Sequence, residues 1–408
     1  MTGGFRRRGA TVREAKPEEE EMNERVAVVA GSLAQKPEQG GHSWVLLQYL
    51  LGLRKLGWNV LFIDRLEPEM CLDEEGKPCP FEWSQNLRYF LRVMHDFGLQ
   101  ESFSLLYDGG RKWIGLSRKQ LLRQTRGSSF LLNIMGFLQD EEILAAANRR
   151  VFLDIDPGFG QMWKELGLAD VFQGHDQYVT VGGNVGQPDC RIPSCGLDWI
   201  TTLPPVVLDL WPVQRCADNG RVTSVATWRG RYGPVDFGGS RYGLRVHEFR
   251  KFVTIPVLIE GRFELALRIH PEEEQDLSLL RRYGWSLVDP GLVARDPCSY
   301  RSYVQDSMAE FGVAKHMYVA SGSGWFSDRS ACYLASGKPV LMQDTNLTRS
   351  LPTGQGLLTF TNLEEAVEAM KDVSSHYSHH AREARRLAET YFDSSGVLGR
   401  LLDRLRIN

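Results

Sequence analysis

The residues best suited to chemistry lie at positions 318–345, where the chain reads YVASGSGWFSDRSACYLASGKPVLMQDT. A short extended run is expected to end at Ser321–Gly324, whose small residues allow a ligand to approach the backbone closely. Ser323 and Gly324 are therefore candidate ligand contacts. An ordinary strand–helix–strand crossover, in which the glycines only form turns, is the alternative interpretation.

A helix is expected directly after this loop, because Ser327 or Asp328 is a suitable N-cap. The helix would run from about Arg329 to Ser336 and direct its unpaired N–H groups and positive dipole end at the loop. The Arg329 guanidinium would add charge-assisted hydrogen bonds. Together these groups predict a site for an anion such as a diphosphate.

Polar residues that follow two other expected strands suit the same ligand. Arg229 and Gly230 follow an expected strand at 222–227, one residue after its end. In that position the arginine would pair with phosphate oxygens, and the glycine would let a ligand approach the backbone. Surface solvation is the alternative role for Arg229. Gln343 and Asp344 follow the strand after the diphosphate helix and are candidates for binding sugar hydroxyls, or for forming a hydrogen-bonded turn.

His42 is the candidate general base. It follows Gly40 and Gly41 in the first loop of the chain, and Asp156 ends an expected strand at 151–155. A hydroxyl nucleophile must lose its proton, and an imidazole oriented by a carboxylate removes it efficiently near neutral pH. The alternatives for His42 are a helix cap or a hydrogen bond to a substrate.

The elements expected to position these residues alternate between strand and helix. At 408 residues the chain exceeds what one hydrophobic core usually supports, so two domains are expected. Strands are expected at 26–30, 59–64, 130–135, 151–155, 178–181, 222–227, 263–269 and 285–288. Helices are expected at 44–56, within 81–106, and at 118–124, 141–147, 244–252, 275–283, 300–311, 363–370, 376–392 and 397–405.

This alternation predicts an α/β fold with two Rossmann-like domains, whose parallel sheets face each other across a cleft. The expected units are a disordered tail at 1–24, a first domain at 25–203, a proline-rich linker at 204–220, a second domain at 221–375 and terminal helices at 376–408. Translation could also begin at Met22, which directly precedes the first strand.

Composition excludes several classes of protein. Hydrophobic residues make up 42% and charged residues 24%, as in a globular protein, and the net charge of −3 gives no general reason to bind nucleic acid or an anionic membrane. No apolar run reaches the roughly 20 residues that span a bilayer, so a cytoplasmic location is expected. The seven cysteines lack paired spacing and are expected to be reduced, without a zinc site.

The turn Ala335-Ser336-Gly337-Lys338-Pro339-Val340 resembles the donor-binding region of GT-B glycosyltransferases. The resemblance implies transfer of a hexose or deoxysugar from a nucleotide-diphosphate sugar to a hydroxyl of a small acceptor. It places the donor in the second domain and the acceptor in the first, beside Gly40 and Gly41. It also implies a last helix that crosses back to the first domain, and no cofactor other than the nucleotide-sugar co-substrate.

Two departures from the family pattern matter. Retaining enzymes carry two glutamates around this loop and helix, where this chain has Gly324 and Cys332, and inverting plant-type enzymes carry a His-Cys-Gly stretch in place of Ser321–Gly324. The stereochemistry of transfer therefore stays open. Asp154-Ile155-Asp156 mimics a metal-binding motif but ends a buried strand, so no required metal is expected.

Two other functions remain compatible with this interpretation. One is a nucleotide-sugar epimerase of the same fold, and the other is a noncatalytic protein that binds a sugar or nucleotide. A dinucleotide oxidoreductase is disfavoured because the loop at 31–41 lacks the GxGxxG spacing. The sugar, the nucleotide base, the acceptor and the oligomeric state are not determined by the sequence.

Overall fold

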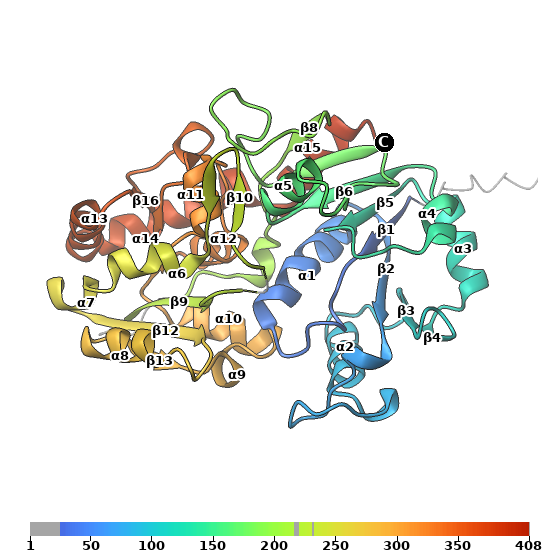
Figure 1. The fold of residues 1–408 in the computed structure, drawn as a ribbon, viewed down its shortest axis with the longest axis horizontal. Coiled ribbons are helices and arrows are strands. Elements are labelled where there is room, and N and C mark those ends of the chain that lie inside the picture. Colours follow the sequence, from blue (N-terminus) through green and yellow to red (C-terminus); the bar gives the residue numbers. More distant parts are fainter. Residues whose placement is uncertain (1–24, 216–219, 231, 408) are drawn as a thin grey trace, which may run out of the picture.

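The computed structural model describes residues 25–215, 220–230 and 232–407, arranged as two α/β lobes side by side (Figure 1). The expected tail at 1–24 and part of the expected linker, 216–219, lie outside the described residues. Within the described part of the chain, no helix has the length and apolar character needed to cross a membrane.

The first lobe is built on an eight-stranded sheet of order β4-β3-β2-β1-β5-β6-β7-β8, parallel except for the β3–β4 pair. The strands are β1 (Val26–Ala30), β2 (Asn59–Leu66), β3 (Phe103–Tyr107), β4 (Lys112–Gly115), β5 (Phe130–Ile134), β6 (Arg150–Asp154), β7 (Gln177–Thr180) and β8 (Trp199–Thr201). The helices are α1 (Gly40–Lys55), α2 (Gln85–Asp96), α3 (Arg118–Gly127), α4 (Glu141–Ala146) and α5 (Phe159–Glu165).

The second lobe is built on a parallel six-stranded sheet of order β13-β12-β9-β14-β15-β16 and carries a separate hairpin, β10–β11. The strands are β9 (Arg221–Thr227), β10 (Val235–Phe237), β11 (Ser240–Tyr242), β12 (Arg262–Arg268), β13 (Ser286–Val288), β14 (Ala309–Gly312), β15 (Val340–Gln343) and β16 (Leu357–Phe360). Its first helices are α6 (Arg245–Phe249), α7 (Ile255–Leu258), α8 (Glu274–Arg282), α9 (Pro290–Val293) and α10 (Pro297–Gln305).

The remaining helices are α11 (His316–Ser321), α12 (Asp328–Ala335), α13 (Leu363–Ser375), α14 (Tyr377–Leu387), a short π-helix (Ala388–Phe392) and α15 (Ser394–Leu405). α15 lies against α1 of the first lobe, since a Cβ added at Gly52 of α1 would lie 2.6 Å from Leu398 Cδ1. One continuous hydrophobic cluster contains buried side chains of both lobes. The lobes therefore share a core as well as a cleft.

Two sequence-based predictions near position 310 are wrong. The expected helix at 300–311 is instead α10 followed by β14, and the run at 318–320, expected to be extended, belongs to α11. α10 begins with an N-cap at Asp296 and a proline at its first position, and β14 is buried at the centre of the second sheet. Ala309–Gly312 forms a strand because this short, fully buried segment pairs with β9 on one side and β15 on the other, at the centre of the sheet.

Candidate functional site

A cleft of about 530 Å³ separates the two lobes. The first lobe contributes the start of α1 and the loops after β5 and β6, and the second lobe contributes the loops after β9, β12 and β14 and the start of α12. Ligands of open α/β folds bind beyond the carboxyl ends of strands, where these loops meet. Its polar lining residues are Lys36, Gln39, His42, Asp156, Thr227, Tyr232, Arg245, Arg268, Tyr300, Lys315, Tyr318, Ser327, Asp328 and Arg329.

His42 lines the cleft from the first turn of α1, whereas the sequence predicted a loop there and a helix that begins only at position 44. Its Nε2 lies 3.1 Å from Ser32 Oγ. Gly40 and Gly41 are the first residues of α1, and a Cβ added at Gly41 would lie 2.9 Å from the Tyr300 ring. The glycines therefore allow the start of α1 to pack closely against α10 of the other lobe.

Asp156 lines the same cleft, but its carboxylate contacts the second lobe. Lys315 Nζ donates to Asp156 Oδ2 at 2.6 Å, and the Tyr318 hydroxyl donates to Oδ1. Burial, and then the neighbouring Asp156, raise the pKa of Tyr318 well above its ordinary value, so its hydroxyl stays protonated and able to donate. Asp156 thus positions Lys315 across the cleft, whereas the sequence predicted that it would orient His42.

Three basic residues gather where β9, β12 and β14 end, and sequence reasoning missed all of them. Arg268 is the last residue of β12, Arg245 is the first residue of α6, and Lys315 follows β14. Burial, and then the nearby Arg329, lower the pKa of Arg245 to about 10, which leaves it charged at neutral pH. Recognising β14 as a strand would have indicated Lys315, because that residue then follows the carboxyl end of a central strand.

Two helix N-termini also face this basic group. α1 and α12 both begin at the cleft, and Ser327 and Asp328 at the start of α12 line it. Helix N-termini present unpaired N–H groups and partial positive charge, which stabilise an anion. Burial raises the pKa of the Asp328 carboxyl, which weakens its repulsion of an anionic ligand.

Arg329 lines the cleft but is held by the protein. Its Nε donates to Glu310 Oε1, and its Nη1 donates to the Val225 carbonyl oxygen at 2.8 Å. Glu310 is fully buried, so Arg329 is the counter-ion of a buried carboxylate. Arg329, predicted as one of the residues that cradle a diphosphate, therefore also has a structural role.

The structure does not bring the Gly-rich loop to the cleft. Ser323 is fully buried, and neither Ser323 nor Gly324 lines the cavity. The Gly324 N–H donates to the Thr345 carbonyl at 2.7 Å, and the Asn184 N–H of the first lobe donates to the Ser323 carbonyl at 3.0 Å. The loop therefore joins the lobes, and the structure does not place Ser323 and Gly324, predicted to cradle a phosphate, among the residues that line the cleft.

Gln343 and Asp344 also lie away from the cleft lining. Gln343 Nε2 donates to Glu248 Oε2 at 2.5 Å, and Asp344 Oδ1 accepts from the Leu347 N–H at 3.1 Å. The alternative interpretation of a hydrogen-bonded turn describes Asp344 better than a sugar contact.

Arg229 and Gly230 lie beside the cleft. Both line an adjoining cavity of about 300 Å³, and Gly230 lines the cleft as well. Arg229 Nη2 donates to Glu273 Oε2 at 2.9 Å, so part of its guanidinium is already engaged. Arg245, Arg268 and Lys315 also line this adjoining cavity, so Arg229 and Gly230 lie beside that basic group.

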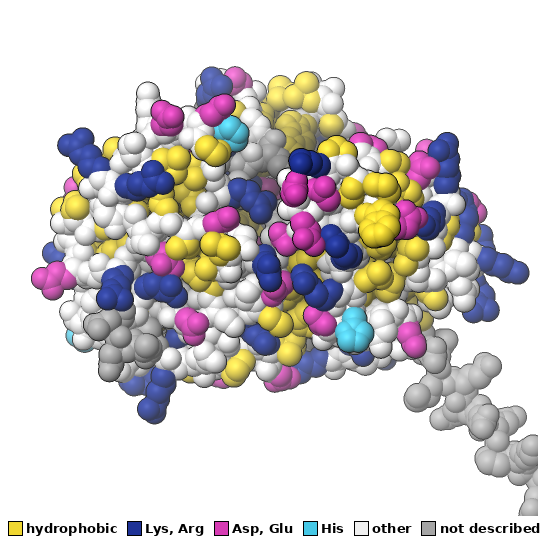
Figure 2. All heavy atoms as spheres, turned by 90° about the horizontal axis from the view of Figure 1, so that it is seen from below, with side chains coloured by type: hydrophobic (Ala, Val, Ile, Leu, Met, Phe, Trp, Pro, Cys, Tyr) yellow, Lys and Arg dark blue, Asp and Glu magenta, His cyan; other side chains and the backbone are white. Residues whose placement is uncertain are grey.

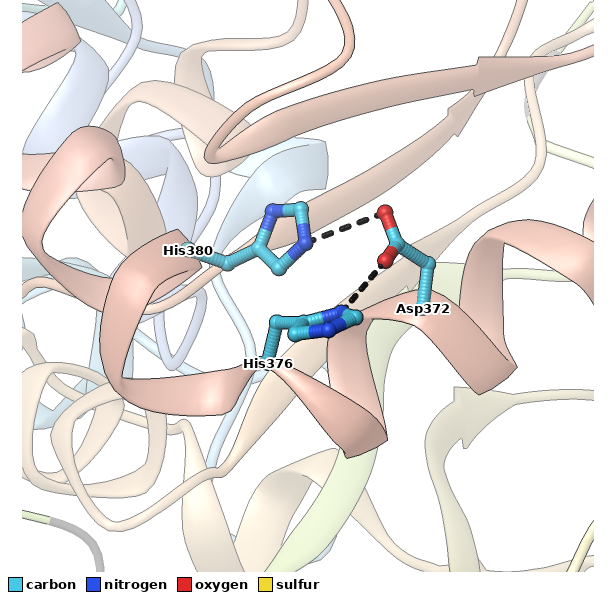
Figure 3. A group of neighbouring side chains, drawn as sticks. All are labelled: Asp372, His376 and His380. Carbon is cyan, nitrogen blue, oxygen red and sulfur yellow. Dashed lines mark hydrogen bonds and ion pairs between the residues drawn. The ribbon is translucent and has the colours of Figure 1, made fainter.

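One cluster away from the cleft has the residue types of a metal site. Figure 3 shows Asp372, His376 and His380 converging between α13 and α14. His376 Nδ1 lies 2.8 Å from Asp372 Oδ1, and His380 Nε2 lies 3.2 Å from Oδ2.

The hydrogen bonds of His380 do not suit a metal ligand. The Gly356 N–H donates to His380 Nδ1 at 3.2 Å, so Nε2 carries the ring proton and donates it to Asp372. Metal-bound histidine has the opposite arrangement, in which the free ring nitrogen donates a proton to a partner. The three residues therefore form a hydrogen-bonded clamp between α13, α14 and the loop before β16.

The second candidate metal motif does not assemble either. Asp154 is buried, and its carboxylate accepts hydrogen bonds from Gln161, Thr180 and the Asp156 N–H. Burial raises the pKa of Asp154 to about 6. The Asp154 side chain is thus enclosed by protein donors, while Asp156 faces the cleft.

No family model and no curated protein sequence matches this chain. Solved structures do match over 93–94% of it. They include an alpha-glucosyltransferase in complex with UDP-glucose and DNA (13% identity, TM-score 0.57, 99% of that chain covered). Also similar are Anabaena HepE in complex with UDP-glucose (10%, 0.54, 99% covered) and sucrose-phosphate synthase from Thermosynechococcus elongatus (11%, 0.52, 99% covered).

The likeness extends over both lobes and shows that this chain has the GT-B fold. The expected fold class, two Rossmann-like domains with parallel sheets that face each other across a cleft, is confirmed.

Proposed function

We propose that this protein is a cytoplasmic glycosyltransferase that moves a sugar from a nucleotide-diphosphate donor to a hydroxyl of a small acceptor. The observation that carries the proposal is the convergence of Arg245, Arg268 and Lys315 with the N-terminus of α12 on the second-lobe side of the cleft, opposite His42 at the start of α1. Several of the structural neighbours were solved with UDP or UDP-glucose.

The basic group and His42, on opposite sides of the cleft, would assist different parts of the transfer. Breaking the bond between sugar and diphosphate places negative charge on the leaving phosphate, which fixed cations and helix N-termini stabilise in a site that excludes water. His42 would take the proton of the attacking acceptor hydroxyl. Lys315, held by Asp156, would reach the leaving group without further ordering, because its ammonium is already positioned.

The distribution of charge supports the proposal of a small acceptor instead of DNA, although one structural neighbour was solved with DNA. Basic and acidic side chains are interspersed on the face shown in Figure 2, and the net charge of the chain is −3. A DNA-binding face normally presents a concentrated basic patch.

A donor-binding experiment tests the proposal through Arg268. The melting temperature would be measured with a panel of nucleoside diphosphates, because a ligand that binds only the folded state raises it. Arg268→Ala is expected to weaken binding of the preferred nucleotide by about tenfold or more, through loss of a charge-assisted contact. Arg262→Ala is the matched control, because Arg262 is exposed at the opposite end of the same strand.

Turnover distinguishes the remaining functions. A transferase forms a glycosylated product only when an acceptor is present, whereas an epimerase changes the donor sugar without one. His42→Ala is expected to abolish transfer while nucleotide binding is retained. Nucleotide binding without any turnover would favour a noncatalytic protein, and failure of every nucleoside diphosphate to bind would refute the proposal.

A further inference from the structure

A second cavity, of about 190 Å³, lies where the two lobes meet away from the cleft. It is open to solvent and is lined by β8 and the loops after β7 and β8 in the first lobe, by α15 with the exposed Arg400 and Arg404, and by the loop after β15 in the second lobe. None of its lining residues lines the cleft or the cavity that adjoins it. The proposed glycosyl transfer therefore assigns it no role.

The polar side chains of this cavity are all able to donate hydrogen bonds. Arg400 and Arg404 lie four residues apart on α15 and so project from the same face of the helix. Thr201, Thr202 and Ser350 add hydroxyl groups, and no Asp or Glu lies among the described lining residues. The rest of the lining is glycine and aliphatic side chains.

Few of these donors are used within the protein. Arg404 Nη1 donates to the Thr201 carbonyl at 2.5 Å, and Thr202 Oγ1 donates to the Leu203 carbonyl at 3.3 Å. Among the ion pairs of the described residues, Arg400 and Arg404 have no carboxylate partner. A concave site with two arginines, three hydroxyls and no internal counter-charge is complementary to an oxyanion.

We propose that this cavity is an anion site that binds a phosphate group, either orthophosphate or the phosphate of a small phosphomonoester. Arg400 and Arg404 contact the phosphate oxygens, and the hydroxyls of Thr201 and Ser350 complete the hydrogen bonding. Thr201 belongs to the first lobe and Ser350 to the second, so a bound phosphate holds the two lobes together at this junction. The site is independent of the diphosphate-binding group in the cleft.

Binding of orthophosphate and of a hexose phosphate, measured by calorimetry and by melting temperature, tests this site. Arg400→Gln and Arg404→Gln are each expected to weaken binding by about tenfold, since each loses a bidentate charge-assisted contact. Arg382→Gln, an exposed arginine of α14, is the matched control and is expected to bind like the wild type. The general stabilisation of folded proteins by phosphate salts would appear equally in all variants.

The cleft variant Arg268→Ala separates this proposal from the proposed function, because it is expected to keep phosphate binding here while losing nucleoside diphosphate. Tighter binding of the hexose phosphate would identify a phosphomonoester as the ligand, and equal binding would identify orthophosphate. Equal phosphate affinity in the wild type and in both α15 variants, or no binding at all, would overturn the proposal.

Discussion

At the scale of single residues, the role of a charged side chain depends more on the group it pairs with than on where the residue stands in the sequence. Arg329 starts the predicted diphosphate helix, yet it neutralises the buried Glu310. Lys315, which no motif singled out, lies in the cleft with its ammonium held by Asp156. Arginine at a helix start is equally suited to a phosphate and to a buried carboxylate, so its sequence context does not distinguish the two roles.

Arg329→Ala is expected to destabilise the protein by about 3–5 kcal/mol, because it leaves Glu310 buried without a counter-charge. Denaturant unfolding measures this loss. The double variant Arg329→Met/Glu310→Leu removes both charges and is expected to recover most of the stability. A stable Arg329→Ala protein that no longer bound any nucleoside diphosphate would restore Arg329 as a donor ligand.

His380 makes stability depend on pH. Burial lowers its pKa below the ordinary 6.5, although Asp372 opposes this shift. The unfolded chain then binds a proton that the folded chain resists, so the stability contributed by neutral His380 is complete above about pH 6.5 and is lost as the pH falls below that value.

The variant His380→Gln isolates this contribution, because glutamine still accepts from the Gly356 N–H but does not titrate. Between about pH 8 and pH 5 the wild type is expected to lose more stability than the variant. Parallel pH profiles of the two proteins would contradict this expectation. Added Zn²⁺ is expected to leave both melting temperatures unchanged, since the Nδ1 hydrogen bond opposes metal binding at Nε2.

At the scale of elements, the Gly-rich loop between α11 and α12 holds the lobes together. Gly324 has a φ of 66°, which favours glycine, and a Cβ added there would lie 2.7 Å from Asn184 Cγ. Gly230 has a φ of 86°, but an added Cβ would meet nothing within 4 Å. The two glycines thus share a backbone requirement and differ in packing.

Alanine at either position is expected to cost about 1–2 kcal/mol for the left-handed backbone. Gly324→Ala is expected to cost about 1–3 kcal/mol more, because its methyl group crowds Asn184 at the contact between the lobes. Comparison of the free energies of unfolding of Gly324→Ala and Gly230→Ala measures the difference. Equal losses would show that the loop adapts without disturbing that contact.

At the scale of the whole molecule, the last helix couples the C-terminal part of the chain to the first lobe. Val206 and Asp393 pair as an isolated bridge, and α15 packs on α1 beside Gly52. The shared hydrophobic cluster therefore includes residues from the first strand and from the last helix.

Gly52→Ala is expected to disturb this packing, since its Cβ would lie 2.6 Å from Leu398 and 3.0 Å from Ser394. Gly399 in α15 has nothing within 4 Å of an added Cβ, so Gly399→Ala is expected to stabilise the protein by about 0.5–1 kcal/mol through helix propensity. The two variants are expected to differ by about 1–3 kcal/mol in unfolding free energy. A similar gain in both would mean that α15 shifts freely on α1.

The sequence by itself determined the strands and helices whose pattern is local. The strands expected at 26–30 and 59–64 are present as β1 and β2, and Gly337 ends α12 as expected, with a φ of 70°. Their order indicated two Rossmann-like units. These signals depend on neighbouring residues, which a sequence displays directly.

Only the tertiary structure decided which polar groups meet. Asp156 pairs with Lys315 and Tyr318, more than 150 residues away in the chain, and the Gly-rich loop turns toward Asn184 instead of the cleft. The sequence did not indicate β14, because its four residues form a strand through pairing with β9 and β15, which are distant from it in the chain. Long-range pairing selects among several locally acceptable conformations and partners, and that selection leaves no pattern in a single sequence.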